Sequence, residues 1–72
     1  MINTSTNPPR LLRLTEVRYL TGLSKSSIYN YMNKGLFPHS IALGLRSVAW
    51  AEYDIQLWIN DRINIRDQMV AS

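Results

Sequence analysis

The sequence predicts a mainly α-helical domain with a small β-hairpin, arranged as a winged helix-turn-helix of three helices and a two-stranded wing. Three observations lead to this fold class. Residues 14–36 form two short amphipathic patterns joined at Gly22, residues 40–50 alternate in polarity about a turn, and a helical period returns from Ala51. A chain of 72 residues is long enough for one domain. We assign this domain to residues 10–64.

The chain begins with a polar segment that ends in two prolines, so we expect residues 1–9 to form a disordered tail. Residues 10–14 are predicted to be an extended lead-in whose leucines pack inward, while Arg10 and Arg13 stay available to a phosphate backbone. The segment lacks the apolar region of a secretion signal, and no apolar stretch reaches membrane-spanning length. We therefore expect a soluble, cytoplasmic protein that does not enter a membrane.

The first helix is predicted to begin after Thr15, whose hydroxyl can accept hydrogen bonds from the next backbone N–H groups. Leu14 and Tyr19 then stand at the two positions of a hydrophobic staple. Val17 and Leu20 share one face of this helix, so we expect both to point into the core.

The second helix is predicted to begin at Lys25, with Ser24 as its N-cap. Leu23 and Ile28 take the matching staple positions. Gly35 follows the last predicted turn at the position where helices most often end on glycine.

The outward face of this second helix is polar. Its members are Lys25, Ser26, Ser27, Tyr29, Asn30 and Asn33, since Ile28, Tyr31 and Met32 follow the i, i+3, i+4 pattern of an inward face. Such a face suits a DNA major groove, because serine permits close approach, asparagine can bond an adenine edge, and lysine reaches phosphates. An ordinary solvated face is the alternative at this point.

A β-hairpin is predicted after Pro38, which cannot continue a helix. Apolar residues point inward on both sides of the turn at residues 44–47, namely Ile41 and Leu43 before it and Val48 and Trp50 after it. Because a two-stranded hairpin is unstable alone, its apolar face must lie against the helices and its tip must project as a wing. Arg46 is at that tip.

The third helix is predicted from an apolar stripe of Ile55, Trp58, Ile59 and Ile63. Residues 65–72 are predicted to fray, and the alternative for the apolar residues outside the stripe (Leu57, Ile65, Met69 and Val70) is a dimer contact. The predicted core consists of Val17, Leu20, Ile28, Ile41, Val48, Trp50, Ile55 and Trp58.

Charge is distributed unevenly along the chain. The net charge is +3 and the pI is about 9.7. The first fifty residues contain six basic side chains and one acid, Glu16, and so carry about +5, whereas the remainder has four acids and two arginines and carries about −2. The first part therefore suits an anionic partner.

Several function classes are disfavoured by composition. There is no cysteine, and the single His39 lacks the partner ligands that a zinc site requires. No nucleophile with a base and no glycine-rich phosphate loop is evident, so we expect no catalysis, no metal, no cofactor and no small-molecule ligand.

The order of several short segments resembles the AlpA family of phage and prophage transcription regulators, which are close to excisionases and to MerR-type winged helix-turn-helix proteins. The matching segments are Arg-Leu-Leu-Arg-Leu-Thr-Glu-Val at 10–17, Leu-Thr-Gly-Leu-Ser-Lys-Ser-Ser-Ile-Tyr at 20–29, Gly-Leu-Phe-Pro at 35–38, Ile-Ala-Leu-Gly at 41–44, Val-Ala-Trp at 48–50 and Leu-Trp-Ile at 57–59. The resemblance implies that the second helix is a recognition helix and that Arg46 contacts the backbone or the minor groove.

Together these lines of reasoning predict a sequence-specific regulator of transcription that binds double-stranded DNA through residues 25–34 and a wing at residues 41–50. The expected contact residues are Arg10, Arg13, Lys25, Ser26, Ser27, Tyr29, Asn30, Asn33, Lys34 and Arg46. One helix and one wing cover a short half-site, so binding would need two protomers or cooperative neighbours. The alternatives are an excisionase-like recombination factor and, in a different class, a protein-interaction or antitoxin-like module.

Overall fold

A computed structural model describes residues 9–71, and side chains for residues 9–70. The predicted tail therefore lies outside the described residues, apart from Pro9. The elements follow one another as β1 (Leu11–Leu12), α1 (Leu14–Thr21), α2 (Lys25–Asn33), β2 (Ile41–Ala42), β3 (Val48–Ala51) and α3 (Glu52–Ala71). This arrangement confirms the predicted fold class.

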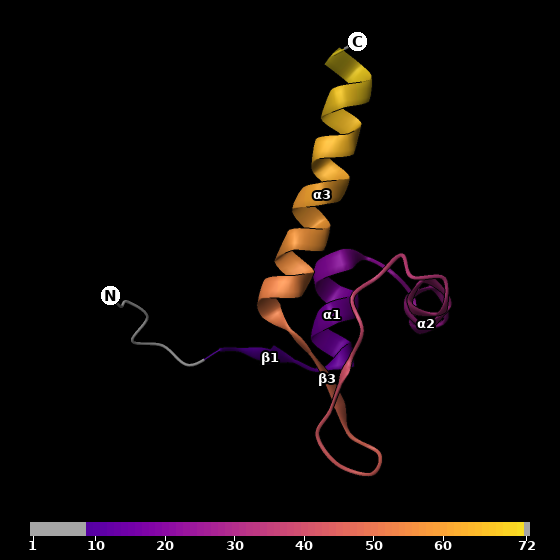
Figure 1. Cartoon of the computed structure of the whole chain (residues 1–72), viewed down its shortest axis with the longest axis vertical. Helices are drawn as coiled ribbons and strands as arrows, with labels where there is room; N and C mark the ends of the chain where they lie inside the picture. The colour runs from indigo at the N-terminus through magenta and orange to yellow at the C-terminus, as the bar shows by residue number, and fades with distance from the viewer. Residues whose placement is uncertain (1–8, 72) are drawn as a thin grey trace.

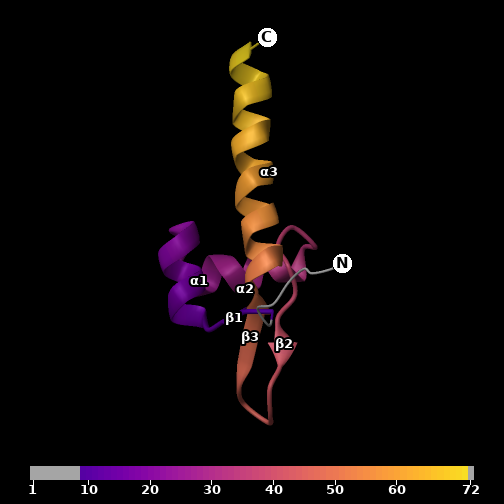
Figure 2. The same cartoon turned by 90° about the vertical axis from the view of Figure 1, so that its left-hand side faces the viewer.

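The elements are arranged around β3. This strand leads directly into α3, so the hairpin and α3 point in opposite directions from the middle of the molecule (Figures 1 and 2). Helices α1 and α3 both pack on β3, and α1 also contacts α2 and β1. Helix α2 lies to the side of α1 at the level where α3 begins, and the hairpin extends below both (Figure 1).

The hairpin is confirmed, but it belongs to a larger sheet. Within the described residues the strand order is β1-β3-β2, and all pairs are antiparallel. The hairpin pairs Ile41 with Ala49, whereas β1 pairs Leu12 with Trp50. The lead-in that we predicted to be extended therefore covers the second edge of β3. A strand of two residues carries too little alternation to be recognised from sequence.

The predicted start of the first helix is wrong by two residues. Arg13 is the N-cap residue, because its carbonyl oxygen accepts the Val17 N–H at 3.0 Å and no side chain caps the helix. Thr15 is inside the first turn, and Tyr19 is 86% exposed, so the predicted staple is wrong as well. In the observed helix the two staple positions belong to Leu12 and Val17, and both are fully buried.

The ends of α2 agree with the prediction. The Ser24 hydroxyl accepts the Ser27 N–H at 3.1 Å. At the other end Gly35 has φ 73°, and the Leu36 N–H reaches back to the Tyr31 carbonyl oxygen at 2.8 Å. This is a Schellman motif, whose left-handed residue favours glycine.

The core is smaller than the sequence predicted. Leu12, Val17, Ile28, Trp50 and Ile55 are fully buried and Phe37 is 4% exposed, which confirms four of the predicted members. Val48 and Trp58 are half-buried at the edge of this core. Leu20 is 45% exposed and Ile41 is 41% exposed, so these two assignments are wrong. So small a domain has too little interior for every apolar stripe, and β2 packs mainly on β3 rather than under a helix.

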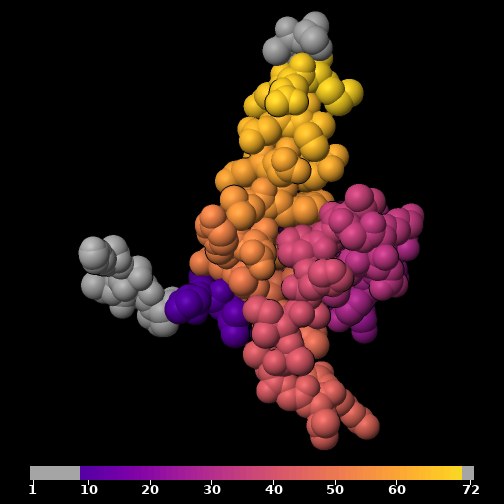
Figure 3. Space-filling view, viewed as in Figure 1, coloured from indigo at the N-terminus to yellow at the C-terminus, as the bar shows by residue number. Residues whose placement is uncertain are grey.

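Helix α3 extends well beyond the core. Its packed residues end at Ile59, Ile63 is 42% exposed, and every residue from 61 to 70 is exposed. The segment expected to fray is part of α3, which runs to Ala71 and contains no glycine or proline. Whether it frays stays a prediction. The helix projects as a rod in the space-filling view (Figure 3). The limit of the domain at residue 64 stays a prediction.

Candidate nucleic-acid interface

The outward face of α2 carries a line of small polar side chains. Ser26, Asn30 and Asn33 follow the spacing i, i+4, i+7 and are all exposed, on the side of the helix opposite the buried Ile28. We call these three residues the polar stripe. Hydroxyl and amide groups are among the groups with which a groove-bound helix reads base edges.

Two of the predicted contact residues on α2, Ser27 and Tyr29, also make contacts inside the domain. Ser27 is half-buried, and its hydroxyl lies 3.1 Å from the Ser24 hydroxyl. Tyr29 is half-buried, and its ring meets Trp50 edge to face with centroids 6.3 Å apart. The contact between Tyr29 and Trp50 joins α2 to β3, whereas the contact between Ser27 and Ser24 belongs to the N-cap of the helix itself. The polar pattern predicted neither role.

Lysines lie at the two ends of the polar stripe. Lys25 is the first residue of α2 and Lys34 is its C-cap, and both are exposed. No ion pair found within residues 9–70 involves either lysine. Both positive charges are therefore available to an anionic partner.

The wing has a short, closed tip. The Leu43 N–H donates to the Ser47 carbonyl oxygen at 2.7 Å, which closes the loop between β2 and β3. Arg46 is exposed on this loop and takes part in none of the ion pairs of the described residues. The tip projects below the body of the molecule (Figures 1 and 2).

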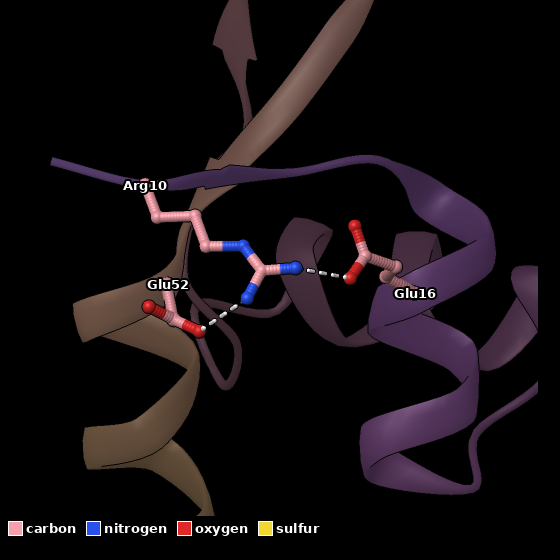
Figure 4. A network of polar contacts seen from close by, with 3 residues as sticks. All are labelled: Arg10, Glu16 and Glu52. Atoms are coloured by element: carbon pink, nitrogen blue, oxygen red, sulfur yellow. Dashed lines mark hydrogen bonds and ion pairs between the residues drawn. The ribbon is translucent and has the colours of Figure 1, made fainter.

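Arg10 has a different environment from the other basic candidates. Its guanidinium lies 2.8 Å from a Glu16 carboxylate oxygen and 3.5 Å from a Glu52 carboxylate oxygen (Figure 4). It thereby joins the residue before β1 to the first turns of α1 and α3. Arg13, which is the exposed N-cap of α1, has no such bridge among the described residues. The charge of Arg10 is matched locally, whereas the charge of Arg13 is available.

A hollow next to the start of α2 brings in residues that the sequence reasoning missed. It measures about 420 Å³ and is lined by Thr15, Arg18, Tyr19, Gly22, Leu23 and Ser24. Arg18 and Tyr19 are exposed and place a guanidinium and a phenol beside the first turn of α2. The sequence did contain a signal, because residues 15, 18, 19 and 22 share one face of a helix. We missed it because Tyr19 had been assigned to a hydrophobic staple and so was expected to pack inward.

Acidic groups are segregated from this surface. No Asp or Glu occurs from Val17 to Ala51, a stretch that contains Arg18, Lys25, Lys34 and Arg46 together with α2 and the wing. A larger hollow of about 840 Å³ lies between residues 35–39 and α3, and its walls include two acids, Asp54 and Asp61, and one base, Arg62. Those carboxylates would repel a polyanion, so the candidate interface is the surface formed by α2 and the wing.

The described residues offer neither a metal site nor a membrane-spanning helix. Within residues 9–70 no three His, Cys, Asp or Glu side chains are grouped so that they could hold a metal ion, and His39 is exposed. None of the helices described is both long enough and apolar enough to cross a membrane.

Comparison with known proteins places this interface in a family context. Residues 10–63 match the family described as prophage CP4-57 regulatory protein (AlpA), and this range includes every predicted contact residue. The chain is 44% identical over 54 residues to the uncharacterized protein ORF88 of Enterobacteria phage P4, a match that spans 75% of this chain and 61% of that protein, less than two thirds of its length. It is 34% identical over 62 residues to the DNA-binding transcriptional activator AlpA of Escherichia coli (strain K12), spanning 78% of this chain and 89% of the relative.

Proposed function

Because the chain belongs to the AlpA family of prophage regulatory proteins, we propose that it binds double-stranded DNA and regulates transcription. In this proposal α2 lies in the major groove and the wing lies on the backbone or in the minor groove. The observation that carries it is the exposed polar stripe of α2, which lies with the wing on the part of the chain that has no acidic residue. The name of the Escherichia coli relative, a DNA-binding transcriptional activator, supports it further.

The contact residues divide by chemistry. Asn30, Ser26 and Asn33 project from the outer side of α2 and would reach base edges, where an amide can pair with adenine. Lys25, Lys34, Arg13 and Arg46 would neutralise phosphates and set the position of the protein on the duplex.

Tyr29 and Ser27 belong to a third group. The ring of Tyr29 holds α2 against Trp50, and Ser27 completes the N-cap of α2 with Ser24, while a phosphate could still meet either hydroxyl. Arg18 and Tyr19, next to the start of α2, extend the same positive surface towards the backbone.

Activators, repressors and excision factors can share one scaffold, so the proposal names regulation without its direction. One helix and one wing cover only a short half-site. We therefore propose that two protomers, or a cooperative row of them, bind adjacent half-sites. Footprinting on the DNA around the chain's own gene would give the number, spacing and symmetry of these sites.

The direct test is a titration of fluorescent duplex DNA at two salt concentrations. If Z phosphates are neutralised, log K should fall with log salt at a slope of about −0.9Z. Arg62→Ala removes an exposed positive charge from α3, so it should leave both affinity and slope as in the unaltered protein. Absence of duplex binding, together with capture of an acidic protein partner, would instead favour the protein-interaction module.

A further inference from the structure

The wing carries apolar side chains whose exposure rises towards its tip. Ile41, Leu43 and Leu45 occupy alternate positions and are 41%, 48% and 105% exposed. Leu45 has the highest relative exposure of the exposed large apolar residues in the described part of the chain. Phosphate contacts by Arg46 would not explain a leucine at this place.

Nothing within the described residues covers the tip. Neither the core nor the side chains packed on its edge include Ile41, Leu43 or Leu45. A Cβ placed on Gly44 would have no neighbour within 4 Å, so the loop is open on that side as well. The space-filling view shows the hairpin projecting below the body of the molecule (Figure 3). Its apolar end is therefore available to a binding partner.

The charges around the tip favour DNA over protein. Arg46 follows Leu45 directly, and the nearest acidic residue before the wing is Glu16, whereas the nearest after it is Glu52. A single side chain at the end of a hairpin can enter the minor groove, which is about 6 Å wide. Leucine is among the side chains that enter this groove and separate neighbouring base pairs.

We propose that Leu45 is an apolar wedge that enters the minor groove of the bound duplex and kinks it. The inference rests on the proposed DNA-binding function and adds to it a bend in the DNA. Arg46 would hold the tip by its attraction to the groove and the adjacent phosphates. Pyrimidine–purine steps kink most easily, so the protein should prefer DNA sites that have a TA or CA/TG step under the wing. This sequence preference would be separate from base contacts made by α2.

Fluorescence energy transfer across a duplex labelled at both ends tests the wedge, with the full chain bound to its footprinted site. The unaltered protein should bring the two dyes closer together. Leu45→Ser should lose at least half of that change and bind several-fold more weakly, whereas Leu45→Phe should keep it. Tyr53→Ser is the control for loss of an exposed apolar side chain, because Tyr53 is 69% exposed near the start of α3. Leu45 packs on nothing described, so Leu45→Ser should melt at the same temperature as the unaltered protein.

Each outcome decides between the readings. Equal bending by Leu45→Ser and the unaltered protein, with binding retained, would overturn the wedge and leave the proposed DNA binding intact. Failure of the unaltered protein to bind any duplex would overturn both. If Leu45→Ser removed only the cooperative loading of a second protomer, with the bend at a single site unchanged, the tip would belong to a protein contact and the wedge would be wrong.

Discussion

Tyr29 of α2 and Trp50 of β3 meet edge to face, with ring centroids 6.3 Å apart and ring planes at 67°. The same indole donates its N–H to the Pro38 carbonyl oxygen at 3.1 Å. Trp50 therefore fixes α2 and the segment after it to the strand that forms one side of the wing. This contact sets the angle between the polar stripe and the wing.

The first prediction concerns stability at this contact. Trp50 is fully buried, so Trp50→Ala should lower the free energy of unfolding by about 3–5 kcal/mol, most of what a small domain has. Trp50→Phe keeps a ring but leaves the Pro38 carbonyl without its donor, which should cost about 1–3 kcal/mol. Urea unfolding followed by circular dichroism measures both. Trp58→Ala is the comparison, because Trp58 is only half-buried; a larger loss there than at Trp50 would contradict the core described above.

The second prediction separates the two roles of Tyr29. Tyr29→Phe keeps the ring against Trp50, so the free energy of unfolding should change by less than about 0.5 kcal/mol. Loss of the hydroxyl should still weaken duplex binding by about 0.5–1.5 kcal/mol if it reaches a phosphate or base. Tyr29→Leu should also lose about 0.5–1.5 kcal/mol of folding stability with the ring contact. Unchanged duplex binding by Tyr29→Phe would limit Tyr29 to packing.

The parts of the fold that could be predicted from sequence rest on local chemistry. Ser24 caps α2 because a serine hydroxyl before an amphipathic pattern satisfies the first N–H groups. Gly22 and Gly35 end the two helices with φ of 74° and 73°, a conformation that other residues avoid. The hairpin followed from alternation about a turn. Each of these signals is contained in a few neighbouring residues.

The parts that could not be predicted depend on distant neighbours. Leu20 lies three residues after the buried Val17 and so on the same face of α1, a spacing typical of core residues. Whether its side chain is buried depends on how far the small sheet extends beneath it. The pairing of Leu12 with Trp50 joins residues that are far apart in the sequence. The ion pairs of Arg10 with Glu16 and Glu52 likewise form only once the chain has folded. For the interface, the residue types of the polar stripe were visible in the sequence, whereas the packing of Tyr29 was not.

The third prediction contrasts two arginines near the start of the domain. Arg10→Gln removes two exposed ion pairs, with Glu16 and Glu52, so it should lower the free energy of unfolding by about 1 kcal/mol or less. Arg13→Gln removes a charge that is not paired within the described residues and should leave stability nearly unchanged. For duplex binding the order should reverse, with Arg13→Gln the weaker binder. Equal loss of binding in both variants would mean that Arg10 leaves its carboxylates to meet DNA.

The fourth prediction tests the limit of the domain. Residues 61–70 are all exposed, so a chain that stops after Asn64 should unfold within about 0.5 kcal/mol of the full chain. Analytical ultracentrifugation should show the same oligomeric state for the full chain and the shortened chain. A clear loss of stability, or a dimer present only in the full chain, would assign a protein contact to the end of α3. Duplex binding by the shortened chain would then report whether that contact is needed on DNA.

The fifth prediction separates the polar stripe from the phosphate contacts. Asn30→Ala removes an amide that can pair with a base, so binding to the footprinted site should weaken by about 1–3 kcal/mol while binding to random duplex changes much less. Asn64→Ala, on the exposed end of α3, is the matched control and should bind as the unaltered protein does. Competition between the two duplexes measures the specificity ratio directly.

Lysine and arginine variants should behave in the opposite way. Lys25→Ala and Arg46→Ala should each weaken binding to every sequence by a similar factor. Each should also reduce the slope of log K against log salt by about one unit, because each removes a positive charge that neutralises one phosphate. The ranking of sites should survive Lys25→Ala. Arg46→Ala should alter it only where the width of the minor groove differs between sites, since a narrow groove attracts arginine more strongly. If all three variants fold by circular dichroism and bind the site as the unaltered protein does, α2 and the wing are not the interface.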